Sequence, residues 1–217
     1  MIIAIDGPAG VGKSTIAHMV AQRCGFYFLN SGNFYRAVAW SHLKRNKDPF
    51  DADSVLDTAR STDITVRNGR IHVDGQDVED MLHVHGIDQC VAQVSVDPRL
   101  RVYVNSLLRK VAEGQDIVTE GRDVTTVVFP DADLKFYFDA QPEIRARRRF
   151  GQHPDEASYA QVLETLKKRD EIDKGKAFGG LKVSEDAIVL DTSHLTIEEV
   201  CERVLAAIFV RKNAFKQ

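Results

Sequence analysis

Residues 7–14 constrain this chain more than any other segment, because they read Gly-Pro-Ala-Gly-Val-Gly-Lys-Ser and match the pattern Gly-x-x-x-x-Gly-Lys-Ser. The apolar run Ile2–Asp6 precedes the pattern, and apolar residues at helical spacing, among them Ile16 and Val20, follow it before Gly25. This order of strand, glycine loop and helix is the context in which the pattern indicates a phosphate-binding loop. We therefore expect a strand–loop–helix unit that binds a nucleoside triphosphate.

The chemistry of such a loop assigns roles to its residues. Glycines let backbone N–H groups close around a polyphosphate, and the following helix N-terminus carries a favourable partial positive charge. Lys13 is expected to reach the β- and γ-phosphates, and Ser14 to offer its hydroxyl to Mg²⁺, partly through water. The predicted triphosphate-binding residues are Gly7, Pro8, Ala9, Gly10, Val11, Gly12, Lys13, Ser14 and Thr15.

Two other interpretations of this loop are disfavoured by the sequence. One is a glycine-rich turn that binds nothing, which the match of spacing, Lys-Ser and flanking pattern disfavours. The other is a dinucleotide site, but Ala9 interrupts its glycine pattern and Asn30, rather than an acid, ends the next strand.

Length and composition restrict the class of protein. With 217 residues, 43% of them apolar, the chain has enough apolar material for one substantial core. A net charge of −3 disfavours a general binder of nucleic acid or of membrane surfaces. The basic residues between 145 and 182 instead suit a small anionic ligand.

The cysteines and the absence of long apolar runs favour a cytoplasmic location. Cys24, Cys90 and Cys201 are odd in number and far apart, as expected for reduced, mostly buried thiols. No apolar run approaches the length that spans a membrane, and a strand beginning at Ile2 leaves no room for a signal peptide. We expect a monomer with no nucleic-acid or membrane partner.

Short β-rich runs alternate with helical patterns, which predicts an α/β fold with one doubly wound, five-stranded parallel sheet and helices on both faces. Helices are expected over 34–43, after Pro98, after Pro142 and from the capping box at Thr196. The expected strands are Ile2–Asp6, Phe26–Asn30, Asp116–Glu120, Leu134–Asp139 and Ala187–Asp191.

Two stretches interrupt this alternation. Residues 64–67 and 70–73 flank Asn68-Gly69, a strong signal for a β-hairpin, here inserted into a parallel α/β chain. We assign about 31–95 to a substrate-side subdomain that contains this hairpin. The polar, basic stretch of about 151–182 suits a lid that closes over phosphates.

Two polar segments follow strand ends, the edge at which open α/β sheets place ligands. In the segment 30–36, Arg36 offers a fork suited to phosphate and Tyr35 a flat face with a hydroxyl. In the segment 120–123, Arg122 can hold an anion, Asp123 can accept from an amino group, and Glu120 can orient Mg²⁺-bound water. Ordinary surface loops are the alternative for both.

The basic helix around 167–176 has a simpler alternative, a solvated charged face. Arg169 and Asp173, one helical turn apart, then form only a surface ion pair.

The motifs taken together resemble the bacterial cytidylate kinases, a family of P-loop nucleoside monophosphate kinases. The resemblance covers nearly the whole chain and follows the family's order. It rests on Gly7–Ser14, Ser31-Gly32-x-x-Tyr35-Arg36, Gly121-Arg122-Asp123, 127–132, Arg145-Ala146-x-Arg148-Arg149, Arg169-Asp170-x-x-Asp173 and 190–193.

The resemblance implies a P-loop kinase core that transfers the γ-phosphoryl group of ATP, with Mg²⁺, to CMP or dCMP. It implies catalytic roles for Lys13, Arg122 and Arg169, and a contact of Arg148 with ATP. It implies base recognition by Arg101 and Asp123, and a ribose contact by Asp173. The implied CMP-binding residues are Ser31, Tyr35, Arg36, Arg101, Arg122, Asp123 and Asp173.

The chain departs from the family's usual residues at several of these places. Asn30 stands where Asp is usual, Ala92 where a pocket Ser is often found, and Ile172 and Lys176 where lid arginines are common. Phe178-Gly179-Gly180-Leu181 replaces a usual Ala-Pro-Leu. Two alternatives stay open: a kinase for another monophosphate such as UMP or AMP, and an ATP-binding switch that is not a kinase.

Overall fold

The computed structural model describes residues 1–152 and 157–214, so 153–156 of the expected lid lie outside the described residues. A five-stranded parallel sheet with the order β2-β6-β1-β7-β8 forms the centre. Its strands are β1 (Ile2–Asp6), β2 (Tyr27–Asn30), β6 (Ile117–Gly121), β7 (Leu134–Asp139) and β8 (Ile188–Asp191). The predicted sheet is thus confirmed, with three strands beginning one residue later than expected and β6 also ending one later.

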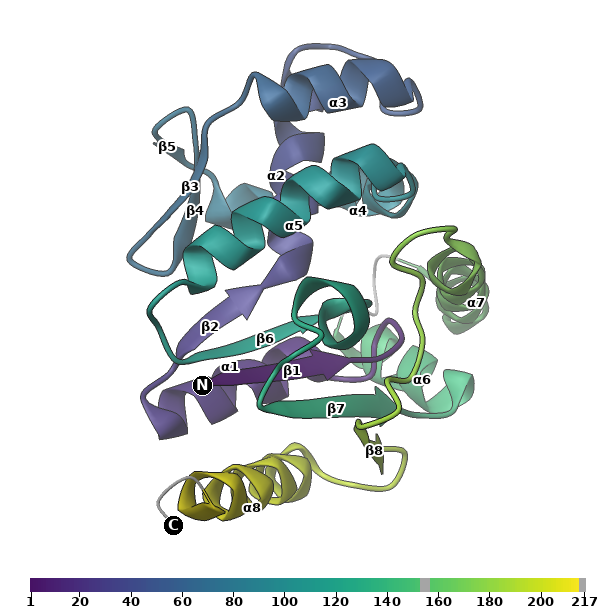
Figure 1. The fold of residues 1–217 in the computed structure, drawn as a ribbon. Helices are drawn as coiled ribbons and strands as arrows, with labels where there is room; N and C mark the ends of the chain where they lie inside the picture. The colour runs from purple at the N-terminus through teal and green to yellow at the C-terminus, as the bar shows by residue number, and fades with distance from the viewer. Residues whose placement is uncertain (153–156, 215–217) are drawn as a thin grey trace.

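Helices cover both faces of this sheet (Figure 1). Ile3 and Ile5 of β1 pack with α1 (Lys13–Cys24) and α8 (Ile197–Ala214) in one apolar cluster. Ala4, which points to the opposite face, packs in a second cluster with α2 (Ser31–Lys44) and α5 (Pro98–Ala112). The alternation along one strand therefore divides the apolar core into two layers.

A second group of elements lies on one side of the sheet, in the upper half of Figure 1. It contains α2, α5 and a small antiparallel sheet with the order β3-β4-β5. The remaining elements of this group are α3 (Ala52–Arg60), β3 (Ile64–Arg67), β4 (Arg70–Val73), β5 (Gln76–Asp77), η1 (Glu79–Met81) and α4 (His85–Val94).

The predicted hairpin is present as β3 and β4. Asn68 and Gly69 both have positive φ, 52° and 77°, as a two-residue type I′ turn requires. The strand β5 was not predicted, although Asp74-Gly75, with φ of 49° and 81°, is a second turn of the same kind.

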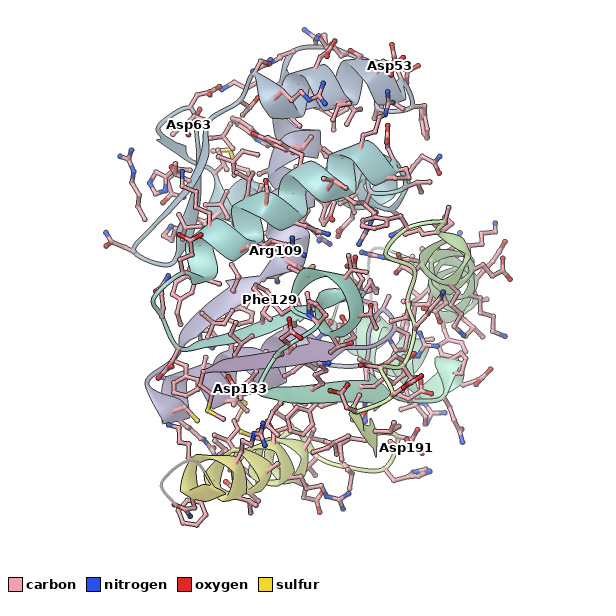
Figure 2. The ribbon with its side chains drawn as sticks, viewed as in Figure 1. Asp53, Asp63, Arg109, Phe129, Asp133 and Asp191 are labelled. Carbon is pink, nitrogen blue, oxygen red and sulfur yellow. The ribbon has the colours of Figure 1, made fainter. Side chains whose placement is uncertain are left out.

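Two further helices, α6 (Pro142–Gln152) and α7 (Tyr159–Gly175), lie at the carboxyl ends of the strands, on the right of Figure 1. There α6 packs on α7, and an irregular segment leads from α7 to β8. The single turn η2 (Val124–Val128) follows β6, and Arg109 of α5 (Figure 2) donates to the carbonyl oxygens of Val127 and Val128 at 2.8 and 2.9 Å. These bonds fix η2 against α5.

Helix ends agree with the sequence signals in most places. Thr196 and Glu199 exchange bonds as the capping box before α8 predicts. The expected helix over 34–43 is longer, because Ser31 already begins α2 directly after β2. All three cysteines are free, and no described helix is long and apolar enough to cross a membrane.

Candidate active site

The glycine loop connects β1 to α1 at the carboxyl edge of the sheet, where Figure 1 shows α6 and α7 nearby. Arg145 of α6 is buried and holds the loop by donating to the carbonyl oxygen of Ala9 at 3.0 Å. Its guanidinium also pairs with Asp170 of α7 at 2.7 Å. The conformation of the loop is therefore tied to both helices.

Lys13 lies buried at the start of α1, and its Nζ donates back to the carbonyl oxygen of Pro8 at 2.9 Å. Burial and the nearby Arg122 lower the pKa of Lys13 to about 7, although the carboxylates of Glu120 and Asp6 act in the opposite direction. A buried ammonium that is weakly held in this way gains strongly from an added anion.

Glu120, the penultimate residue of β6, connects the two strand-end segments. Its carboxylate accepts from the Ser14 hydroxyl at 2.7 Å, and its carbonyl oxygen accepts from the Ser31 hydroxyl at 2.7 Å. The register explains the meeting, since Glu120 pairs with Ile5 on one side and with Asn30 on the other. The glycine loop and the start of α2 therefore meet at one residue.

Asp173 of α7 binds two cations of the site. Its Oδ2 accepts from Arg122 Nε at 2.6 Å, and its Oδ1 accepts from Lys176 Nζ at 2.8 Å. Burial alone would raise the pKa of Asp173, but Arg122 and Lys176 hold it well below its usual value. Asp173 is thus a buried ionised partner of Arg122, not a member of a solvated helix face.

Arg101 and Asp123 form a buried ion pair, with 2.5 Å between Nη2 and Oδ1. The Arg101 guanidinium also lies 5.2 Å from the centre of the Tyr35 ring and donates to the carbonyl oxygen of Ser95. One further donor of the pair, Arg101 Nε, and one further acceptor, Asp123 Oδ2, are buried and have no hydrogen-bond partner in the described part of the chain. Such a pair of unused groups suits a polar ligand.

A segment that we call the strap, residues 176–181, packs over this pair. A Cβ on Gly179 would lie 2.2 Å from Asp123 Oδ2 and 2.4 Å from Arg101 Nε, so only glycine fits there. The amide of Leu181 donates to the carbonyl oxygen of Asp173 and ties the strap to the end of α7. Movement of the strap is therefore needed to expose the unused groups of the pair.

Two further arginines lie beside this group. Arg36 of α2 pairs with Asp88 of α4 at 2.7 Å. Burial, together with the charges of Arg122 and Arg36, lowers the pKa of Arg169 to about 10. Arg36, Arg122 and Arg169 therefore form a cluster of like charges, which we call the arginine cluster, next to Lys13.

Arg148 faces a different part of the edge. Its guanidinium donates to the carbonyl oxygen and hydroxyl of Thr192, the residue after β8. The Thr192 hydroxyl in turn reaches the carbonyl oxygen of Val11 in the glycine loop at 3.5 Å. Arg148 thus borders the loop from outside, through Thr192, and is not part of the arginine cluster.

Some residues of this site were absent from the predicted set. Asp6, at the end of β1, accepts from the amides of Val124 and Thr125 at 3.0 and 2.8 Å and fixes η2 beside the site. Burial raises the pKa of Asp6 to about 6. The sequence could have indicated Asp6, because it is an acidic residue at the end of an apolar strand, at the edge where ligands bind. No sequence pattern indicated Asp88, the partner of Arg36.

Comparison with known proteins agrees with this arrangement. The sequence profile of the cytidylate kinase family matches residues 3–209. The cytidylate kinase of Caldanaerobacter subterraneus subsp. tengcongensis is 44% identical over 214 residues, covering 97% of this chain and 95% of the relative. That of Thermodesulfovibrio yellowstonii is 40% identical over 215 residues, covering 95% of this chain and 97% of the relative.

Among solved structures, an uncharacterized protein from Eubacterium ventriosum has a TM-score of 0.54 at 13% identity, over 96% of this chain and 98% of that one, and shares the fold. The family match and the two relatives confirm the resemblance seen in the motifs. The chain belongs to the cytidylate kinase family.

Proposed function

We propose that this protein transfers the γ-phosphoryl group of ATP to CMP or dCMP, giving ADP and CDP or dCDP. The observation that carries the proposal is the double contact of Glu120 with Ser14 and Ser31. It brings a loop suited to a triphosphate against a helix start suited to a monophosphate. Reacting groups held side by side in this way gain the rate advantage of proximity.

The donor side fits ATP with Mg²⁺. The Ser14 hydroxyl and the Glu120 carboxylate are 2.7 Å apart, and oxygen donors of this kind suit a small divalent cation. Ser14 would hold the ion, partly through water, and Glu120 would orient ion-bound water. The bound ion would neutralise charge on the phosphates. Lys13 supplies a positive charge that a triphosphate would hold in its protonated form.

The acceptor side fits cytosine. The free Asp123 Oδ2 would accept from the exocyclic amino group, and the free Arg101 Nε would donate to a ring acceptor. Uracil would place a carbonyl oxygen against the carboxylate, so it would be disfavoured by repulsion and by an unpaired buried group.

The transfer itself needs no general base, because a monophosphate is already largely ionised at neutral pH. Arg122 and Arg169, with Lys13, would stabilise the charge that develops on the transferred group. We propose that about 31–95 binds the monophosphate and that about 151–182 acts as the lid, with its strap covering the base pocket. Closure would exclude water and limit ATP hydrolysis.

The test is ADP release from ATP and Mg²⁺ with CMP, dCMP, UMP and AMP as separate acceptors. We expect CMP and dCMP to stimulate release and UMP and AMP to do so far less. Preference for UMP or AMP would reassign the acceptor. Nucleotide-dependent partner binding without acceptor stimulation would identify a switch instead.

A further inference from the structure

One arginine of the arginine cluster, Arg36, is already paired with a carboxylate, that of Asp88. Asp88 Oδ1 accepts from Arg36 Nη2 at 2.7 Å, and the two side chains are 20% and 12% exposed. Arg36 carries the guanidinium that we expect to bind the phosphate of the acceptor. Its Nε is buried without a hydrogen-bond partner among the described residues, so Asp88 satisfies only part of the guanidinium. A phosphate group binding there would meet a negative charge already in place.

The same carboxylate has a second cation within reach. Asp88 Oδ2 lies 3.5 Å from Arg149 Nη2 on α6, a side chain that is 48% exposed. Asp88 belongs to α4, Arg36 to α2 and Arg149 to α6, so the three side chains come from three different helices. The carboxylate therefore has one partner inside the arginine cluster and one at its edge, and it can leave the first without losing all compensation.

We propose that Asp88 is an internal competitor for the phosphate group of the acceptor: it holds Arg36 until a phosphate displaces it toward Arg149. The proposal rests on the proposed function, because it concerns the same binding site. Its physical basis is repulsion between like charges that share one guanidinium, which lowers the affinity for the incoming anion. An Asp88 that merely orients Arg36 for phosphate predicts the opposite sign.

The experiment is calorimetric titration of the full chain with CMP, cytidine and inorganic phosphate at fixed ionic strength. We expect Asp88→Asn to bind CMP and inorganic phosphate more tightly, on the order of 5- to 50-fold, with cytidine affinity unchanged. The matched control is Asp80→Asn, which removes the same charge from an 85% exposed residue paired with Arg70. It should leave all three affinities unchanged.

A second variant tests the other partner. Arg149→Ala should weaken CMP binding, because Asp88 then has only Arg36 to pair with, and it should do so more than Arg147→Ala, an exposed charge removed from the same helix. Unchanged or weaker phosphate binding by Asp88→Asn overturns the proposal, as does equal tightening for cytidine. If CMP were not the acceptor, the affinity for inorganic phosphate would still test the effect of Asp88. Failure of the acceptor assignment and failure of the Asp88 proposal are therefore distinguishable.

Discussion

The buried ion pair of Arg101 and Asp123 predicts two separable losses, one of stability and one of activity. Asp123→Ala leaves Arg101, which is 2% exposed, without its carboxylate partner. Breaking a buried pair by removing one partner costs about 3–5 kcal/mol. The variant also loses the acceptor proposed for the cytosine amino group, worth about 1–3 kcal/mol, so kcat/KM for CMP should fall about 5- to 150-fold.

The double variant Arg101→Met/Asp123→Ala separates these effects. It removes both charges, and the main remaining loss is the 3.0 Å hydrogen bond from Arg101 to the Ser95 carbonyl oxygen, about 1 kcal/mol. Its free energy of unfolding should lie within about 2 kcal/mol of the parent, above that of Asp123→Ala. Its use of CMP should stay impaired, because neither base contact is restored.

Urea unfolding followed by circular dichroism measures stability, and ADP release with CMP and UMP measures activity. If Asp123→Ala unfolds within about 1 kcal/mol of the parent, or if the double variant is no more stable than the single one, the unpaired Arg101 does not carry the expected burial cost. An unchanged CMP/UMP ratio of kcat/KM in Asp123→Ala would show that the base is recognised elsewhere.

Three further variants test the other parts of the site. Lys13→Ala should lower turnover on the order of 10²–10³-fold. It should not lower the urea midpoint, because burial already destabilises the Lys13 ammonium of the parent. Near-normal turnover would refute the phosphate-loop assignment. Burial lowers the pKa of Lys13 to about 7 from an ordinary 10.5, so folding is penalised below pH 7, and this residue's contribution to the free energy of unfolding should rise between pH 7 and 10.5. For the same reason, kcat/KM for ATP should fall above pH 7, because the Lys13 side chain of the free protein loses its charge. Arg169→Ala should lower kcat by ~10³-fold with little change in ATP affinity. The control Lys168→Ala changes a 69% exposed side chain paired with Glu164 and should behave like the parent, so equal activity of both variants would contradict the lid role. Gly179→Ala should displace the strap and speed hydrogen exchange at the Leu181 amide. The control Gly175→Ala, whose added Cβ would meet no atom of the described residues within 4 Å, should not; unchanged exchange at Leu181 in Gly179→Ala would contradict the packing of the strap on the ion pair.

Features set by local physics were predictable from the sequence. The strands followed from short apolar runs, and parallel pairing placed the ends of β1, β2 and β6 at one edge, which is why Glu120 reaches both Ser14 and Ser31. The hairpin followed from Asn68-Gly69. The strand β5 could also have been predicted, because Asp74-Gly75 is the same turn signal. The strand that follows it has only two residues, Gln76 and Asp77.

Features set by packing between distant elements were not predictable. Asp88 lies at the site because α4 packs on α2, where Asp88 pairs with Arg36. No local sequence pattern predicts that these two helices pack together. The contact between Gly179 and the buried pair likewise depends on how the strap returns from α7. Arg148 illustrates the same limit, since its partner Thr192 lies 44 residues further along the chain.

The most direct measurement of the proposed activity follows the γ-phosphoryl group itself, with ATP labelled at that position and Mg²⁺ present. With CMP added, we expect the label in CDP in a one-to-one ratio with the ADP formed, and little in inorganic phosphate. Label released as inorganic phosphate at the same rate with and without CMP would contradict the account.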